Sequence, residues 1–200
     1  MAGTAPQIYR IVTLSSGASR GSNLLAIHRY FAEHALPVRI HHAIFTSGKA
    51  EALAMCHNLG IAQAVISAQD MRLFEARVLD ILRSEEIALV ALCGFMKLLS
   101  KDFIAAAGIP ILNIHPALLP KYGGKGMHGM NVHQAVFEAK EQVSGATVHR
   151  VDPLYDHGDI LKQAEVDISS CRSAQEIATK VLAQEHLIYA PSIYAELCKA

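Results

Sequence analysis

The chain has 200 residues, 52% of them hydrophobic, and its 18 lysine and arginine residues balance 18 aspartate and glutamate residues. This length and hydrophobic content suit a single domain whose core covers both faces of a sheet. A chain with balanced charge and without blocks of like charge has no electrostatic surface for nucleic acid or an anionic membrane, so we expect small-molecule partners.

Cysteine usage and the N-terminal segment indicate the compartment. The four cysteines are far apart and form no CxxC pair, which argues against a disulfide framework or a zinc knuckle. The first residues, MAGTAPQ, lack the basic and apolar regions of a signal peptide, and every apolar run is shorter than the roughly 20 residues that span a bilayer. We therefore expect a cytoplasmic protein.

Strand-like and helix-like patterns alternate along the whole chain. The first strand ends in the glycine-rich segment SSGASRGSN, and a helical pattern with Ser22 as its expected N-cap follows. In chain order, the expected elements are a strand at 8–14, a helix at 23–34, a strand at 38–45, a helix at 49–59 closed by Gly60, a strand at 62–66, a helix at 70–83, a strand at 87–92, a helix at 100–107, a strand at 110–114, a helix at 131–140, strands at 146–151 and 160–166, and a helix at 173–189 that continues briefly after Pro191.

This pattern defines the fold class. The run at 87–92 is almost entirely apolar, as in strands buried on both faces of a parallel sheet. Repeated strand–helix–strand units predict an α/β fold: a single-domain, open, mostly parallel twisted sheet of Rossmann-like type with helices on both faces. Ligands of such folds bind in the crevice beyond the carboxyl ends of the strands, and the glycine-rich segment 121–129 should form a mobile loop beside it.

The segment with the clearest chemical signal is ILNIHPALLP. It predicts a strand that presents the amide of Asn113 and the imidazole of His115 before Pro116 ends the sheet. The later segment YDHGD supplies Asp156, a carboxylate that can orient the imidazole. Such a group can stabilise a carbonyl oxygen that becomes negative during attack, which indicates acyl transfer. Two simpler interpretations stay open: a backbone carbonyl satisfies His115, and Asp156 is only a turn residue.

The glycine-rich turn has features of a phosphate site. Gly17 and Gly21 allow a tight backbone turn, and the N–H groups near Ser22 and Asn23 point outward at the start of the helix, where a phosphate can bind. The spacing matches neither GxGxxG nor a Walker A loop, because no lysine follows the last glycine, so a hydride carrier or a nucleoside triphosphate is not specifically indicated. An ordinary strand-to-helix turn is the alternative.

The eleven histidines make a metal site a further alternative. Its candidate ligands are His115, His128, His133, His149, Asp152, Asp156, His157 and Asp159. The spacing gives little support, because HExxH is absent and glycine-rich segments separate most of the candidates. We therefore expect no metal, and we expect Cys93 in its apolar strand to be a small core residue rather than a nucleophile.

Five segments, taken together, point to one enzyme family. Three follow each other in order: ALCGFMKLLS, ILNIHPALLPKYGG and GATVHRVDPLYDHGDILKQ. The other two are SGASRGSN and QEHLIYA, so the match covers almost the whole chain. In these segments the chain resembles the phosphoribosylglycinamide formyltransferase family. The resemblance implies transfer of a formyl group from 10-formyltetrahydrofolate to the amine of N1-(5-phospho-D-ribosyl)glycinamide (glycinamide ribonucleotide), giving the N-formyl product and tetrahydrofolate in de novo purine (IMP) biosynthesis.

By this resemblance, Asn113, His115 and Asp156 are the catalytic residues. The amine attacks the formyl carbon, Asn113 and protonated His115 stabilise the oxyanion, and Asp156 favours the charged imidazole and assists proton movement. The implied ribonucleotide-binding residues are Gly17, Arg20, Gly21, Ser22, Asn23 and Glu185. The implied folate-binding residues are Phe95, Met96, Lys97, Leu98, Leu99, Val151 and Asp152.

The resemblance also implies partners and organisation. The expected partners are glycinamide ribonucleotide and the cosubstrate 10-formyltetrahydrofolate, without a metal, a nucleic acid or a membrane. The expected assembly is a monomer or a homodimer. We expect residues 1–200 to form a single formyltransferase domain, with ribonucleotide binding in the N-terminal half and folate binding and catalysis in the C-terminal half.

Three departures from the family pattern affect particular roles. Lys97 stands where many relatives have arginine, so guanidinium stacking is not available. The phosphate turn is two residues longer than the common SGxGSN form, which leaves open which N–H groups contact phosphate and whether Arg20 contributes. The loop GGKGMHGMNVH is also longer, and Asn131 stands where the first histidine of an HxH pair is expected. Whether His128 or His133 assists catalysis is therefore open.

Three other functions compete with formyl transfer. The nearest is a formyltetrahydrofolate deformylase of the same superfamily, because water can replace the amine without changing the catalytic residues. Such hydrolases, like the tRNA-directed formyltransferases, usually carry a further domain for which 200 residues leave no room. An inactive ligand-binding domain would not need Asn113, His115 and Asp156 together, and a metal-dependent hydrolase is the third alternative.

Overall fold

One seven-stranded sheet runs through the computed structural model, which describes residues 7–17 and 19–199. The strands are β1 (Tyr9–Ser15), β2 (Val38–Phe45), β3 (Ala62–Val65), β4 (Leu89–Leu92), β5 (Ile111–His115), β6 (Val143–Arg150) and β7 (Ile160–Asp167). The helices are α1 (Ser22–Glu33), α2 (Ala52–Asn58), α3 (Met71–Ser84), α4 (Lys101–Ala107), α5 (Met130–Glu138) and α6 (Ala174–Leu197). Residues 1–6, which carry most of the targeting expectation, and residue 18 of the glycine-rich turn lie outside the described residues.

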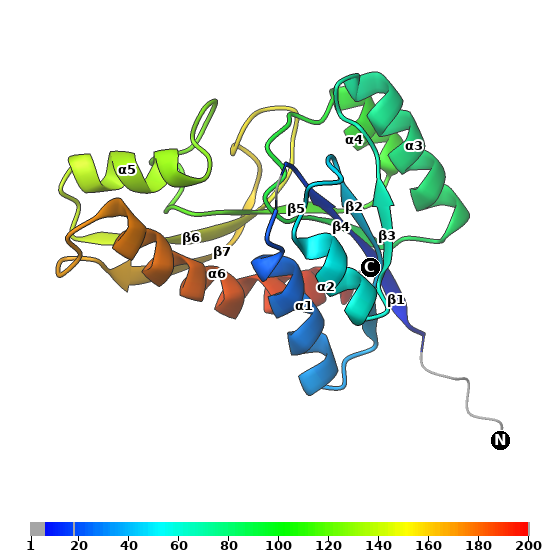
Figure 1. The fold of residues 1–200 in the computed structure, drawn as a ribbon, viewed down its shortest axis with the longest axis horizontal. Helices are drawn as coiled ribbons and strands as arrows, with labels where there is room; N and C mark the ends of the chain where they lie inside the picture. The colour runs from blue at the N-terminus through cyan, green and yellow to red at the C-terminus, as the bar shows by residue number, and fades with distance from the viewer. Residues whose placement is uncertain (1–6, 18, 200) are drawn as a thin grey trace.

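The strands lie in the order β3-β2-β1-β4-β5-β6-β7 (Figure 1). All pairs from β3 to β5 are parallel, whereas β6 and β7 join the β5 edge in antiparallel orientation. The mostly parallel α/β sheet predicted from the sequence is therefore confirmed. Within residues 7–17 and 19–199, no helix combines the length and the apolar character that crossing a membrane requires.

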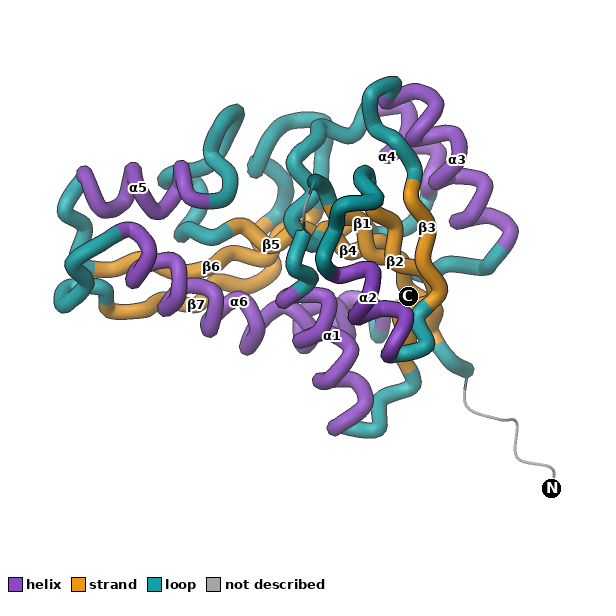
Figure 2. The backbone as a smooth tube through the Cα atoms, in the orientation of Figure 1, coloured by secondary structure: helices purple, strands orange, loops and turns teal. Residues whose placement is uncertain are grey.

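Helices cover both faces of the sheet (Figure 2). On one face, α1, α2 and α6 pack in a first buried cluster that contains Leu24 and Val181. On the other face, α3 and α4 pack in a second cluster that contains Phe74. Neighbouring residues of β4 alternate between the two clusters, with Leu89 in the first and Val90 in the second. This double burial explains why that strand is apolar at every position.

The start of α1 differs from the predicted N-cap. Gly21, not Ser22, occupies the N-cap position, and no side chain in the described part of the chain caps the helix there. Gly21 has φ 76, and a Cβ atom on it would lie 2.6 Å from Cβ of Ala52 and 2.7 Å from Cε of Met55. Glycine suits both the left-handed conformation and the close approach, so Ser22 becomes the first helical residue.

Two other helix boundaries differ from the prediction. Helix α2 begins at Ala52 instead of residue 49, because the N–H of Ala52 donates to the carbonyl of Ser19 (3.1 Å) outside the helix. Helix α6 continues through Pro191, where a break was predicted. Proline cannot donate to the carbonyl of Leu187, so the helix continues with one backbone hydrogen bond fewer at this position.

The sheet topology brings three segments together. Strands β1, β4 and β5 are adjacent and parallel, so their carboxyl ends meet at one edge. The glycine-rich turn follows β1, the segment 94–99 follows β4, and His115 ends β5. After β1 the chain continues to β2 on one side and returns to β4 on the other, and ligands of open α/β sheets bind at such a switch point.

Candidate active site

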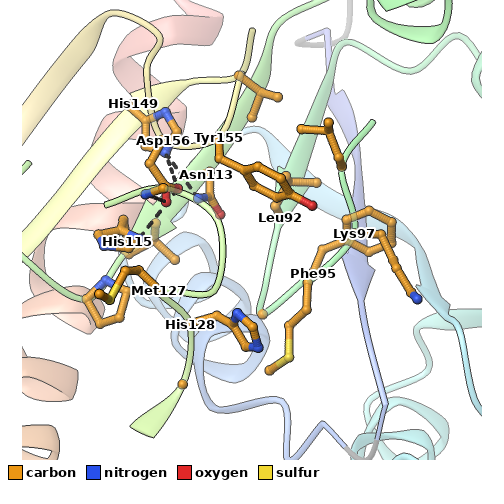
Figure 3. Close-up of a pocket in the computed structure, with 18 of the residues that line it drawn as sticks. Leu92, Phe95, Lys97, Asn113, His115, Met127, His128, His149, Tyr155 and Asp156 are labelled. Atoms are coloured by element: carbon orange, nitrogen blue, oxygen red, sulfur yellow. Dashed lines mark hydrogen bonds and ion pairs between the residues drawn. The ribbon is translucent and has the colours of Figure 1, made fainter. Parts of the chain in front are cut away.

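A cavity of about 540 Å³ lies at this edge of the sheet (Figure 3). The lining residues that the sequence predicted are Ser22, Asn23, Phe95, Met96, Lys97, Leu98, Leu99, Asn113, His115, Val151, Asp152, Asp156 and Glu185. Three predicted residues, Gly17, Arg20 and Gly21, lie outside the lining. The lining residues that the predicted site did not include are chiefly Gly124, Lys125, Gly126, Met127, His128, Gly129, His133, His149, Leu154 and Tyr155.

His115 is the last residue of β5 and is only 3% exposed. Its Nε2 lies 2.8 Å from the carbonyl oxygen of Tyr122, which can only accept, so Nε2 carries a proton. Its Nδ1 lies 3.5 Å from Oδ1 of Asp156. The backbone carbonyl foreseen in the simpler interpretation is thus present, but it satisfies Nε2 alone. It fixes the tautomer and leaves Nδ1 as the nitrogen that can gain or release a proton beside Asp156.

Asp156 is held in a turn that aims its carboxylate at the histidines. Its φ is 52, a left-handed conformation that aspartate tolerates better than most residues. Oδ2 accepts from the N–H of Gly124 (2.9 Å), and Oδ1 lies 3.7 Å from Nε2 of His149. Burial acts to raise the pKa of Asp156, but its interaction with His115, together with the Gly124 N–H, outweighs burial and holds that pKa far below its usual range. The carboxylate is therefore ionised at neutral pH.

The amide of Asn113 is oriented by a residue of the neighbouring strand. In the antiparallel pair, Asn113 lies opposite His149. Nδ1 of His149 lies 2.9 Å from the carbonyl of Arg150 and must donate to it, so Nε2 of the neutral ring can only accept. Nδ2 of Asn113 lies 3.1 Å from that Nε2 and donates to it. These two hydrogen bonds fix which end of the Asn113 amide carries the N–H groups, and they leave one of its N–H groups for a ligand.

His149 is a site residue that the sequence reasoning placed only in the metal alternative. The signal was present, since Thr147 and His149 alternate along β6 as Asn113 and His115 do along β5. The antiparallel register that pairs them could not be read from the sequence. Within the described residues, no group of three or more His, Cys, Asp or Glu side chains is arranged to hold a metal ion.

A second residue that the sequence reasoning missed is Tyr189 of α6. Its buried hydroxyl lies 3.0 Å from the carbonyl of Leu92 and 2.9 Å from the carbonyl of Leu112. These carbonyls end β4 and precede Asn113 on β5, so one hydroxyl bridges the strands that carry the two sides of the cavity. Cys93, next to Leu92, is buried, and burial raises the pKa of its thiol far above the usual range. It is the core residue that the sequence predicted.

On one side, the cavity combines the start of α1 with a buried acid. Glu185 of α6 is 8% exposed and accepts from Nδ2 of Asn23 (2.6 Å). Burial raises the pKa of Glu185, although the bond from Asn23 opposes this shift. Oδ1 of Asn23 has no hydrogen-bond partner among the described residues. The first helical hydrogen bond ends at Leu25, whose N–H donates to Gly21, so the preceding N–H groups of α1 are free to bind an anion.

The segment 95–99 buries its two end residues and exposes the three residues between them. Phe95 and Leu99 are 9% and 2% exposed and belong to the second core cluster, whereas Met96 and Leu98 are 49% and 42% exposed. Lys97, between them, is also exposed. The exposed members give this side an apolar surface with one cation. Opposite, the ring of Tyr155 points across the cavity (Figure 3).

His133 of α5 is a buried imidazole whose Nδ1 makes no hydrogen bond to the described residues. It is 6% exposed. Burial, and then the nearby charge of His115, lower the pKa of His133 to about 4. It is therefore neutral at physiological pH, whereas His128 on the preceding loop is exposed. His133 lies too deep to act as a freely protonated acid.

Several known proteins are similar to this chain in sequence and in fold. A family model described as "Formyl transferase" matches residues 9–193. A phosphoribosylglycinamide formyltransferase of Haemophilus influenzae is 34% identical over 184 residues, which make up 90% of this chain and 83% of that protein. A chloroplastic phosphoribosylglycinamide formyltransferase of Vigna unguiculata is 43% identical over 122 residues, 61% of this chain. The chain spans 39% of the length of that plant relative.

Solved structures agree with these matches. The phosphoribosylglycinamide formyltransferase of Brucella melitensis superposes with a TM-score of 0.85 at 32% identity, covering 96% of both chains. That of Anaplasma phagocytophilum has the same TM-score of 0.85 at 30% identity, over 95% of this chain and 87% of the other. An amide, an imidazole and a carboxylate lie together at the carboxyl edge of such a sheet, and these are groups that acyl transfer can use. The chain belongs to the formyl transferase family, in its phosphoribosylglycinamide formyltransferase branch.

Proposed function

We propose that the protein transfers the formyl group of 10-formyltetrahydrofolate to the amine of glycinamide ribonucleotide, in de novo purine (IMP) biosynthesis. The observation that carries this proposal is the convergence of Asn113, His115 and Asp156 on one cavity, with the start of α1 on one side and the segment 95–99 on the other. An anion site and an apolar surface flank the same three groups, as a reaction between a phosphorylated amine and a flat donor requires.

The three residues suit an addition and elimination at the formyl carbon. The amine nitrogen forms a bond to that carbon, and the carbonyl oxygen takes up the negative charge. The free N–H of Asn113 and the protonated Nδ1 of His115 stabilise that charge. The bond from carbon to N10 of the folate then breaks, N10 receives a proton, and the former amine loses one. Ionised Asp156, beside Nδ1 of His115, relays the proton either directly or through water.

The folate side fits a flat aromatic donor. Met96 and Leu98 expose apolar side chains into the cavity, and Val151 and Asp152 line the opposite loop. Asp152 is fixed by accepting from the N–H of Leu154 (2.8 Å), so the backbone of this loop presents ordered polar groups to a ring edge. We propose that Phe95, Lys97 and Leu99 complete this side, with Phe95 and Leu99 acting mainly through backbone groups because their side chains face the core.

The ribonucleotide side fits a phosphate and a polar sugar or amine end. The N–H groups of Ser22 and Asn23 at the start of α1 attract an anion, and Glu185 provides a buried acceptor for a hydroxyl or an amine. Gly17 and Gly21 shape the turn. Arg20 is exposed outside the cavity lining, so its contribution requires the turn to close on the bound phosphate.

The hydrolase alternative is tested by the same assay. Purified protein is incubated with 10-formyltetrahydrofolate with and without glycinamide ribonucleotide, in buffer without added metal. We expect N-formyl product and tetrahydrofolate in equal amounts, and little formate without the amine. Rapid formate release in the absence of the amine, with no N-formyl product in its presence, would overturn the transferase in favour of the hydrolase.

Location and assembly are part of the proposal. We propose a cytoplasmic enzyme, monomeric or homodimeric, whose four free cysteines suit a reducing compartment. Two relatives are named as chloroplastic, so the location needs a direct test. Cell fractionation with the formyl-transfer assay tests the compartment, and light scattering on the purified protein tests the assembly. Activity confined to an organelle, or a larger oligomer, would contradict these proposals.

A further inference from the structure

The loop 95–99 exposes side chains to the cavity, yet its two ends are anchored. At its start, the N–H of Ser16 donates to the carbonyl of Gly94 (3.1 Å), and the N–H of Met96 donates to Oγ of Ser16 (3.0 Å). Directly after its end, Ser100 is the N-cap of α4. The loop therefore has a free middle between fixed ends, and its shape depends on what holds those ends.

Two consecutive residues of α3 hold the loop from the core side. The ring of Phe74 stacks on the ring of Phe95, with centroids 5.5 Å apart and planes inclined by 22°. Glu75 accepts two hydrogen bonds from Ser100, one from the backbone N–H to Oε1 and one from the hydroxyl to Oε2, both 2.7 Å long. Phe74 thus fixes Phe95 at the start of the loop, and Glu75 fixes Ser100 directly after its end.

The burial of Glu75 makes its contact with Ser100 informative. Glu75 is 8% exposed, and within the described part of the chain both of its hydrogen-bond donors belong to Ser100. A buried carboxylate is costly unless its hydrogen bonds are kept. Both bonds are short, and together they hold the backbone and the hydroxyl of Ser100 in one orientation. This arrangement specifies a geometry that an apolar side chain at position 75 would not.

We propose that Phe74 and Glu75 are positioning residues for the formyl donor. They hold the loop 95–99 in the conformation that receives the folate, and their loss weakens donor binding while ribonucleotide binding is kept. We expect this selectivity because α3 packs on the opposite face of the sheet from α1 and α6, which carry the ribonucleotide side. The contact that joins the loop to the glycine-rich turn, from the N–H of Met96 to Ser16, does not involve Phe74 or Glu75. The inference rests on the proposed function, which places the folate along this loop.

The main test is Glu75→Gln, which keeps the size of the side chain and removes its charge. Isothermal titration calorimetry with tetrahydrofolate and, separately, with glycinamide ribonucleotide suits a chain without tryptophan. We expect tetrahydrofolate affinity to fall about tenfold and ribonucleotide affinity to stay within about twofold. Glu85→Gln is the matched control: Glu85 follows the end of α3 and contacts His41 (2.9 Å) away from the loop, so both affinities should equal those of the wild type.

Phe74→Leu tests the other end of the loop and serves if Glu75→Gln does not fold. It should show the same selective loss, and Glu75→Asp, which keeps the carboxylate, should recover part of the folate affinity. An equal loss for both ligands, or unchanged folate affinity in a folded variant, would overturn the positioning role. A wild-type protein that binds no tetrahydrofolate would instead overturn the proposed function, because that result does not depend on any substitution in α3.

Discussion

The proposed catalytic residues and the proposed phosphate turn meet at one sheet edge, but their side chains are held in different ways. His115 is buried, Asp156 is partly buried, and backbone groups fix both, whereas Asn113 is fixed through His149. In the turn, by contrast, Arg20 is exposed and lies outside the cavity lining. Donors that are already oriented need no reorganisation during reaction, whereas an exposed side chain such as Arg20 must be ordered by the ligand that it binds. Substitutions among Asn113, His115 and Asp156 should therefore lower kcat, whereas substitutions in the phosphate turn should raise KM.

The largest expected effect follows from removing a donor of the catalytic group. Asn113→Ala or His115→Ala should lower kcat by about 100- to 1,000-fold, which corresponds to about 3 to 4 kcal/mol in the barrier. KM for both substrates should change little, because the flanking surfaces are intact. Steady-state kinetics with circular dichroism as a folding control measure this. A His115→Ala enzyme with wild-type turnover would remove the imidazole from the mechanism.

The next largest effect concerns stability and the buried His133. Its pKa is lowered to about 4 in the folded protein, below the value of about 6.5 in an unfolded chain. Between these values the unfolded chain binds the proton and the folded protein does not, so the free energy of unfolding falls as pH drops from about 6.5 to 4, by up to about 3 kcal/mol. Urea unfolding at a series of pH values measures this loss.

His133→Gln should flatten that pH dependence, because glutamine does not titrate. The matched control is His57→Gln on α2, an exposed histidine that should leave the profile unchanged. If the pH profiles of His133→Gln and of the wild type coincide, the assignment of His133 as a buried neutral imidazole is wrong.

A smaller effect is expected where the orientation of the catalytic amide is lost. His149→Ala removes the acceptor of Asn113 and should lower kcat about tenfold, or about 1.4 kcal/mol, while the amide itself remains. The double variant with Asn113→Ala should be no slower than Asn113→Ala alone, since His149 acts through that amide. Fully additive losses would show that His149 acts independently.

The smallest effect belongs to the phosphate turn. Arg20→Ala should raise KM for the ribonucleotide about threefold, with kcat unchanged, because an exposed charge contributes no more than about 1 kcal/mol. The increase should vanish at high salt, where exposed charges are screened. Arg29→Ala, on the exposed side of α1, is the control. A large fall in kcat for Arg20→Ala would show that Arg20 takes part in catalysis and not only in phosphate binding.

The same contrast explains what the sequence could predict. The order of elements was readable, and so was the placement of Asn113 and His115 at the cavity, because apolar periodicity defines strands and a strand end brings its polar residues to that edge. Asp156 lies in the loop between β6 and β7, and only the segment YDHGD indicated it. The role of His149 could not be read from the sequence, since it depends on the antiparallel register of β6 against β5. The N-cap at Gly21 was also hidden, because a close approach to α2 decides it, and α2 is remote in sequence.

A crystal structure with glycinamide ribonucleotide and a formyl-folate analogue that cannot transfer its carbonyl group tests the central claim most directly. The account predicts that the carbonyl oxygen of the analogue lies within about 3 Å of both Nδ2 of Asn113 and Nδ1 of His115, with the amine facing the carbon. A carbonyl oxygen bound away from these two nitrogens, with both substrates in place, would contradict it.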